Sequence, residues 1–173
     1  MNGKQEEERR HTIVVLVDNE PGVLARVIGL FSGRGYNIDS LTVAEVDKAR
    51  ALSRINIVTS GTAYVIEQIK ALLAKLVPVH KVQDLTVEGP AVERELALVK
   101  VAGDRERLVQ ALRIADFMHA RLVDSRPDSL IFEVTGTSDE LDAFIALVEP
   151  IEVSRAGVVA IARGPRALTP ERV

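Results

Sequence analysis

The sequence contains no cysteine and no tryptophan, and only four phenylalanines and two tyrosines occur among its 173 residues. Without cysteine the chain has no disulfide, no thiolate nucleophile and no cysteine ligand for a metal ion. So few aromatic rings offer no broad stacking platform for bases or sugars. The core must therefore be aliphatic, in a soluble chain long enough for one domain or two small ones.

Neither charge nor hydrophobicity is concentrated in one place. The 22 Lys and Arg residues are balanced by 25 Asp and Glu residues, and phosphate binding needs clustered cations, so we expect no nucleic-acid partner. No run reaches the roughly 18 apolar residues of a membrane span, and residues 1–10 are too polar for a signal peptide. The sequence therefore predicts a cytoplasmic protein with no membrane partner.

The first half opens with a strand, a polar turn and a helix. Residues 12–17 (TIVVLV) form a β-branched run of strand length, which stops at the turn formers of residues 18–22. From Val23 the period changes, and apolar residues recur at helical spacing until Gly33. Alternating strands over 40–45 and 53–59 then indicate a hairpin.

A second helix and a closing strand complete this half. Apolar residues from Val65 to Leu76 line one side of the helix, Pro78 ends it, and residues 79–87 have the pattern of a strand. The resulting order, βαββαβ over about 75 residues, is typical of a ferredoxin-like sandwich with helices on one face of the sheet.

The second half repeats this plan beyond the linker candidate Glu-Gly-Pro of residues 88–90. Strand, helix, hairpin, helix and extended segment follow in order, and Thr137 to Glu140 has the form of a capping box. The fold class we expect is α+β, with two ferredoxin-like βαββαβ domains. The predicted divisions are a flexible tail over 1–11, domains over 12–87 and 91–164, and a loose tail over 165–173.

Candidate catalytic and metal-binding groups are scarce. His11, His80 and His119 lie far apart in the sequence without metal-ligand spacing, and each is interpreted as an ordinary solvated side chain. Glu93 and Glu95 are interpreted as one alternating strand edge. No catalytic residue and no metal-binding residue is predicted.

One place is chemically suggestive, the turn of residues 18–22 immediately before a helix. A helix N-terminus has backbone N–H groups without intrahelical partners and a positive dipole, so it accepts a carboxylate well. Gly22 lets a ligand approach the backbone, and the amide of Asn19 can both donate and accept hydrogen bonds. An ordinary capped turn is the alternative interpretation of the same residues.

The residues of this turn also carry a family resemblance. Residues 18–24 (DNEPGVL) resemble the ligand-binding turn of ACT domains, small βαββαβ modules that sense amino acids. The longer stretch 19–43 (NEPGVLARVIGLFSGRGYNIDSLTV) is similar to the regulatory small subunit of acetohydroxyacid synthase, also called acetolactate synthase. Shorter similarities extend the resemblance over most of the chain, at residues 82–85, 93–101, 132–137, 141–144, 155–157 and 163–164.

The resemblance implies a non-catalytic protein in valine, leucine and isoleucine biosynthesis. It implies that the chain activates the catalytic subunit of the synthase and transmits feedback inhibition by a branched-chain amino acid, usually valine. No cofactor is implied for this chain, whereas the catalytic partner would use thiamine diphosphate, Mg and FAD. A homodimer through the ACT domains, joined into one continuous sheet, is implied as well.

Carried over to this sequence, the family's effector site is divided between two protomers. One protomer would provide the turn, and the other would approach with Asn37 and Ile38. The residues of the turn are Asn19, Glu20, Pro21, Gly22, Val23 and Leu24. Val23 and Leu24 would help to shape a small apolar pocket. A stand-alone amino-acid sensor and a small enzyme on the same scaffold are the competing hypotheses.

Overall fold

The computed structural model describes residues 7–170, and contacts within the chain divide it into two compact units. One unit contains the chain up to Val92 and the segment that begins at Ala160, and the other is Glu93–Val159. Each has an antiparallel sheet and two helices, which confirms the α+β class and the repeated βαββαβ order. Within residues 7–170, no helix has the length and apolar character needed to cross a membrane.

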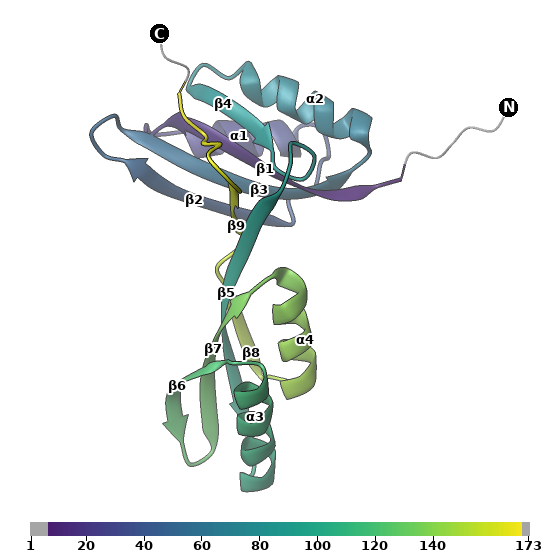
Figure 1. Cartoon of the computed structure of the whole chain (residues 1–173), viewed down its shortest axis with the longest axis vertical. Helices are drawn as coiled ribbons and strands as arrows, with labels where there is room; N and C mark the ends of the chain where they lie inside the picture. The colour runs from purple at the N-terminus through teal and green to yellow at the C-terminus, as the bar shows by residue number, and fades with distance from the viewer. Residues whose placement is uncertain (1–6, 171–173) are drawn as a thin grey trace, which may run out of the picture. The chain divides into compact units, whose positions relative to one another are not determined.

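The first unit has β1 in the interior of its sheet. Its strands pair antiparallel in the order β2-β3-β1-β4, so β2 and β4 are the edges. Figure 1 shows α1 and α2 against this sheet, and both pack into the same core. The elements are β1 (Arg9–Asp18), α1 (Val23–Ser32), β2 (Ser40–Asp47), β3 (Leu52–Gly61), α2 (Ala63–Ala74) and β4 (Val79–Asp84).

β1 is buried on both of its faces. Ile13 and Val15 pack in the core shared with α1 and α2. On the opposite side of the strand, Val14 packs with Leu85 and with Ala160 from the C-terminal segment. Since successive side chains of a strand alternate between the two sides of a sheet, cover on both sides explains an unbroken apolar run.

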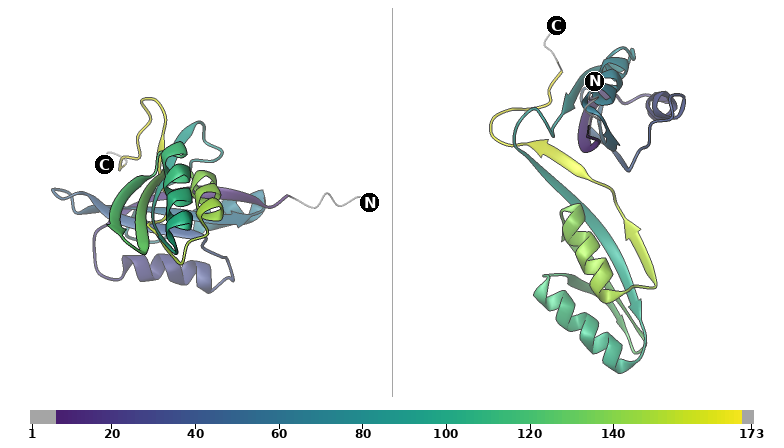
Figure 2. Two further views of the ribbon diagram at one scale, coloured as in Figure 1. Left: turned by 90° about the horizontal axis from the view of Figure 1, so that it is seen from below. Right: turned by 90° about the vertical axis from the view of Figure 1, so that its right-hand side faces the viewer.

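The second unit repeats the arrangement, with sheet order β6-β7-β5-β8. Figure 2 shows α3 and α4 side by side on one face of this sheet. The predicted capping box is present, because Glu140 N–H donates to Thr137 Oγ1 and Thr137 N–H donates to Glu140 Oε2. The elements are β5 (Ala91–Ala102), α3 (Arg105–Phe117), β6 (Arg121–Arg126), β7 (Ser129–Gly136), α4 (Ser138–Val148) and β8 (Glu152–Arg155), and β9 (Val159–Ala162) pairs with β5.

The structure differs from the predicted divisions at three points. β1 begins at Arg9, inside the tail predicted over 1–11, of which residues 1–6 lie outside the described range. The segment from Ala160 belongs to the first unit, although it was predicted as the end of the second domain. The tail predicted over 165–173 is not loose at its start, because Arg166 bonds to two backbone carbonyl groups and Leu168 packs near Val14. Residues 171–173 are not described.

A buried carboxylate joins three elements of the second unit. The Glu95 side chain on β5 is 5% exposed and accepts two bonds from Arg155 of β8, from Nε at 2.9 Å and from Nη2 at 2.6 Å. Arg155 also donates to Asp142 of α4 at 2.5 Å. The paired hydrogen bonds from Arg155 lower the pKa of Glu95 against the opposing effect of burial. The interpretation of Glu95 as part of an alternating strand edge is therefore wrong, because β5 lies between β7 and β8 and the Glu95 side chain is buried.

We expect Glu95→Gln to lower the free energy of unfolding by about 2 kcal/mol at pH 7, because it removes the charge that Arg155 pairs with. The folded-state pKa lies below the unfolded value, so this stabilisation is present above about pH 4.3 and lost as pH falls through the folded pKa. Denaturant unfolding of the full chain at pH 7 and pH 3 measures both effects.

Glu152→Gln is the matched control, because Glu152 pairs with Lys100 across the same two strands with its side chain 65% exposed. It should change stability much less than Glu95→Gln does. A Glu95→Gln effect that stays constant from pH 7 to pH 3 would contradict the assigned role of the charge.

Candidate functional site

The turn between β1 and α1 is held in place by its neighbours. Asp18 N–H donates to the Pro78 carbonyl at 2.8 Å, and Asn19 N–H donates to the Ala51 carbonyl at 2.7 Å. His80 Nε2 lies 2.6 Å from Asp18 Oδ1. The backbone of the turn is thus fixed from both sides, while the side chains of Asn19, Glu20 and Pro21 are exposed.

The N-terminus of α1 differs from those of the three other helices. Side-chain oxygens of Thr62, Asp104 and Thr137 accept N–H groups in the first turns of α2, α3 and α4. At α1 the N-cap is Gly22, which has no side chain to accept such a bond and adopts a left-handed φ of 87°. The first turn of α1 therefore presents backbone N–H groups that no side chain caps, a geometry suited to an external carboxylate.

The space beside Gly22 is open. A Cβ built on this residue meets no atom within 4 Å, and Asn19, Glu20 and Pro21 are exposed. An approaching ligand would thus reach the backbone without displacing protein atoms.

The two apolar residues of the turn differ in burial. Leu24 is half-buried next to the opening, whereas Val23 is 4% exposed and belongs to the hydrophobic core. Val23 thus packs into the core behind the turn, and Leu24 is the more exposed of the two apolar side chains.

Asn37 and Ile38 precede β2, and hydrogen bonds hold Asn37 in place. Thr59 Oγ1 donates to the Asn37 carbonyl at 2.6 Å, and Asn37 Nδ2 donates to Asp39 Oδ1 at 2.5 Å. Ile38 is half-buried against the core. The exposed Asn37 amide therefore projects from a fixed backbone.

The two predicted halves of the site lie at opposite ends of the sheet. Asn19 bonds to Ala51, next to the start of β3, whereas Asp39 N–H bonds to the Val58 carbonyl near its end. At about 3.3 Å per residue, the intervening stretch of strand separates them by roughly 20 Å. One protomer therefore does not bring Asn37 and Ile38 to its own turn.

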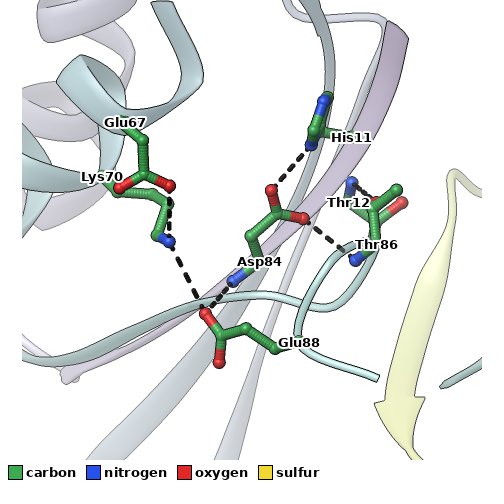
Figure 3. Close-up of polar contacts among 7 residues, drawn as sticks. All are labelled: His11, Thr12, Glu67, Lys70, Asp84, Thr86 and Glu88. Atoms are coloured by element: carbon green, nitrogen blue, oxygen red, sulfur yellow. Dashed lines mark hydrogen bonds and ion pairs between the residues drawn. The ribbon is translucent and has the colours of Figure 1, made fainter. Parts of the chain in front are cut away.

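His11 is buried, contrary to its interpretation as a solvated residue. Its side chain is 7% exposed, and Nδ1 lies 2.7 Å from Oδ2 of Asp84, whose side chain is 1% exposed (Figure 3). The two residues are distant in sequence and meet because β1 and β4 pair side by side. Sequence patterns revealed neither the burial nor the partner, since a polar residue at a strand end is usually solvated.

Asp84 also organises the chain that follows β4. Thr86 N–H donates to Asp84 Oδ1 at 2.9 Å, and Asp84 N–H donates to Glu88 Oε1 at 3.0 Å. Lys70 Nζ of α2 lies 3.6 Å from the same Glu88 oxygen (Figure 3). The buried pair and this turn form one polar network that fixes the end of the first unit's sheet.

The described residues assemble no metal-binding cluster, since no three His, Asp or Glu side chains among residues 7–170 come together. His80 is exposed and pairs with Asp18, and His119 is exposed at the end of α3 with a φ of 57°. The turn before α1 is thus the place where the structure combines an open backbone with exposed polar side chains.

Comparison with known proteins covers both units. Residues 13–81 match the family model described as an AHAS small subunit-like ACT domain, and residues 94–164 match the model described as the small subunit of acetolactate synthase. The acetolactate synthase isozyme 3 small subunit of Salmonella typhimurium is 43% identical over 163 residues, covering 92% of this chain and 99% of that protein. The acetolactate synthase small subunit of Mycolicibacterium smegmatis is 42% identical, covering 91% and 94%.

A solved structure agrees with the fold. The crystal structure of the acetolactate synthase small subunit from Thermotoga maritima aligns with a TM-score of 0.80 at 36% sequence identity. The alignment covers 91% of this chain and 99% of that one. Together with the match over 13–81, it confirms that the first of the two ferredoxin-like domains is an ACT domain.

The buried histidine yields a stability test. His11→Ala removes the side-chain partner of the buried Asp84 carboxylate and leaves its Oδ2 without that bond, so we expect a loss of about 3 kcal/mol in the free energy of unfolding. His80→Ala is the matched control, because it removes a second His–Asp contact that is 36% and 44% exposed, and it should cost less than about 1 kcal/mol. Urea unfolding of the three proteins at pH 7 compares them, and equal losses would contradict the role given to burial.

Proposed function

The chain belongs to the family of acetolactate synthase small subunits, and we propose that it activates the catalytic subunit and confers feedback inhibition by a branched-chain amino acid, with valine the expected effector. The relatives are named as small subunits of the synthase, which confirms the prediction of a regulatory chain that does not itself catalyse. The observation that carries the proposal is the uncapped N-terminus of α1 beside the open Gly22.

The effector's carboxylate would bind the N–H groups at the start of α1. The positive end of the helix dipole and the N–H donors that no side chain caps both favour an anion at this position. The exposed Asn19 amide would act beside it, and its Nδ2 already donates to Glu45 Oε1 at 3.1 Å. Leu24 would provide the apolar contact for a branched side chain. Glu20 and Pro21 would line the outer edge of the proposed effector site.

A homodimer through the edge strand β2 would complete the site. Val43 and Val46 of β2 are 47% and 55% exposed, and the strand is an edge of the sheet. Antiparallel pairing of two β2 strands would place the start of one beside the end of the other. Asn37 and Ile38 of one copy would thus approach the end of β2 that lies next to Asn19 of its partner.

Feedback requires that the effector bind two states of the complex with different affinity, because equal affinity shifts no equilibrium. A site shared by two protomers provides that difference, since the ligand stabilises the arrangement in which both halves meet. A coupling of about 1–3 kcal/mol suffices for a 5- to 150-fold response. The chemistry itself would belong to the catalytic partner and its cofactors, thiamine diphosphate, Mg and FAD.

Reconstitution tests the proposal directly. The full chain is mixed with the catalytic subunit from the same organism, and acetolactate formation is measured with and without valine, leucine and isoleucine. We expect the chain to raise the activity and valine to reverse much of that increase. If the chain binds an amino acid but leaves acetolactate formation unchanged, it is a stand-alone sensor and the proposal is wrong.

Gly22→Asp tests the position of the site. The new carboxylate would occupy the open space beside the N-terminus of α1 and repel the carboxylate of the effector, so feedback should weaken at least about tenfold while activation persists. The measurement is a valine titration of the reconstituted complex.

Two variants serve as controls for Gly22→Asp. Gly29→Asp adds the same charge to an open position within α1, away from its N-terminus, and should leave the titration unchanged. Gly22→Asn has nearly the same shape without the charge and should weaken feedback less. Unaltered inhibition in Gly22→Asp would sink the assignment of the turn.

A further inference from the structure

The segment that begins at Ala160 is attached to the first sheet. Ala160 is 7% exposed, its N–H lies 3.4 Å from Asn56 Oδ1, and its carbonyl accepts a hydrogen bond from Arg54 Nη2 at 2.5 Å. Burial lowers the pKa of the half-buried Arg54, and the Ala160 carbonyl gives this guanidinium a partner within the unit. Both partners of Ala160 lie on β3, next to the edge strand β2.

Further along, the same segment binds the stretch of chain that leads into β5. Arg163 N–H donates to the Pro90 carbonyl at 2.8 Å, and its Nε donates to the Ala91 carbonyl at 3.3 Å. Arg166 donates to the carbonyl groups of Glu88 and Pro90, the latter from Nη2 at 3.2 Å. Three backbone carbonyls of residues 88–91 are therefore held by two arginines. We call residues 160–168 (yellow in Figure 1) the C-terminal clasp.

Gly89 shows how close this contact is. Its φ of +122° favours glycine, and a Cβ there would lie 2.8 Å from Arg166 Nη2 and 3.0 Å from Nη1. Leu168 adds an apolar contact on the cluster of Val14 and Leu85. The guanidinium lies over residue 89 because no side chain occupies that position.

The clasp therefore contacts the chain just before it leaves the first unit. Residues 88–91 lead into β5, which continues beyond Val92 into the second unit. Asn56, which contacts the clasp, also donates from Nδ2 to Thr42 Oγ1 of β2 at 2.9 Å. One side chain thus connects the clasp to the edge strand that the proposed homodimer would use.

We propose that the C-terminal clasp is a regulatory element, which holds the linker on the effector-binding domain so that a change at the β2 edge reaches the second domain. This inference rests on the proposed function. Release of the clasp leaves a free linker, through which the second domain no longer senses whether the effector is bound. Activation, which needs no signal from the effector, persists after release.

Hydrogen exchange in the full chain tests whether the clasp holds the linker on the first domain. Arg166→Ala removes charge-assisted hydrogen bonds to the linker, so the amides of residues 85–92 should exchange about tenfold faster. The control is Arg113→Ala, an exposed arginine of α3 that is not among the residues bonded to 88–91. Unchanged exchange in Arg166→Ala would overturn the proposal.

A double-mutant cycle with Gly89→Ala tests the contact itself. The added Cβ displaces the Arg166 guanidinium, so Gly89→Ala should speed exchange of the linker in the unaltered chain. Two contributions make up the faster exchange. Backbone strain at residue 89 does not depend on Arg166 and should remain in the Arg166→Ala background, whereas displacement of the guanidinium should contribute nothing there. Fully additive effects would show that Arg166 does not lie over residue 89.

The regulatory part is tested in the complex with the catalytic subunit. The ratio of acetolactate formation without and with saturating valine should fall at least about threefold in Arg166→Ala, with activation within about twofold of the unaltered chain. If the unaltered chain responds to valine and Arg166→Ala responds equally, the clasp has no regulatory role. If the unaltered chain responds to no branched-chain amino acid, the proposed function fails first, a result that is distinct from failure of the clasp.

Discussion

The first domain depends on one constraint, that β1 is apolar on both faces and must be covered on both. α1 and α2 cover one face around Ile13 and Val15, as in any two-layer sandwich. The other face, at Val14, is covered in part by the end of the chain, through Ala160 and Leu168. This requirement brings residues from both ends of the sequence together. It also fixes β1 so firmly that the turn at its end has a defined position, which is what a binding site needs.

Each domain also contains a buried carboxylate that pairs with a basic side chain distant in sequence. Asp84 is paired with His11 in the first unit, and Glu95 with Arg155 in the second. Each pair joins elements that are distant in sequence, and each buried carboxylate accepts further bonds, from Thr86 N–H and from Ser138 Oγ respectively. A buried charge that loses its partner is costly, so each pair favours the packing in which its two partners meet.

Unlike these buried pairs, the proposed effector site would not be complete within one chain. The proposed anion-binding end is the N-terminus of α1, which no side chain caps, and the proposed second half, Asn37 and Ile38, lies roughly 20 Å away at the other end of the sheet. An incomplete site is suited to regulation, because the ligand stabilises whichever assembly brings the halves together. The edge strand β2 is connected through Asn56 to the C-terminal segment, because Asn56 bonds both to Thr42 of β2 and to Ala160.

The sequence by itself determined the order of elements, the two-domain plan, the capping box at Thr137 and the turn of residues 18–22, because hydrophobic periodicity and turn chemistry are local. It also carried the family resemblance, since the motif at 19–43 is continuous. Only the tertiary structure decided that His11 and Glu95 are buried, that Val23 belongs to the core, and that residues 160–168 return to the first domain. These features depend on pairing between residues distant along the chain, and local patterns contain no information about which distant partner will satisfy a polar group or cover an apolar face.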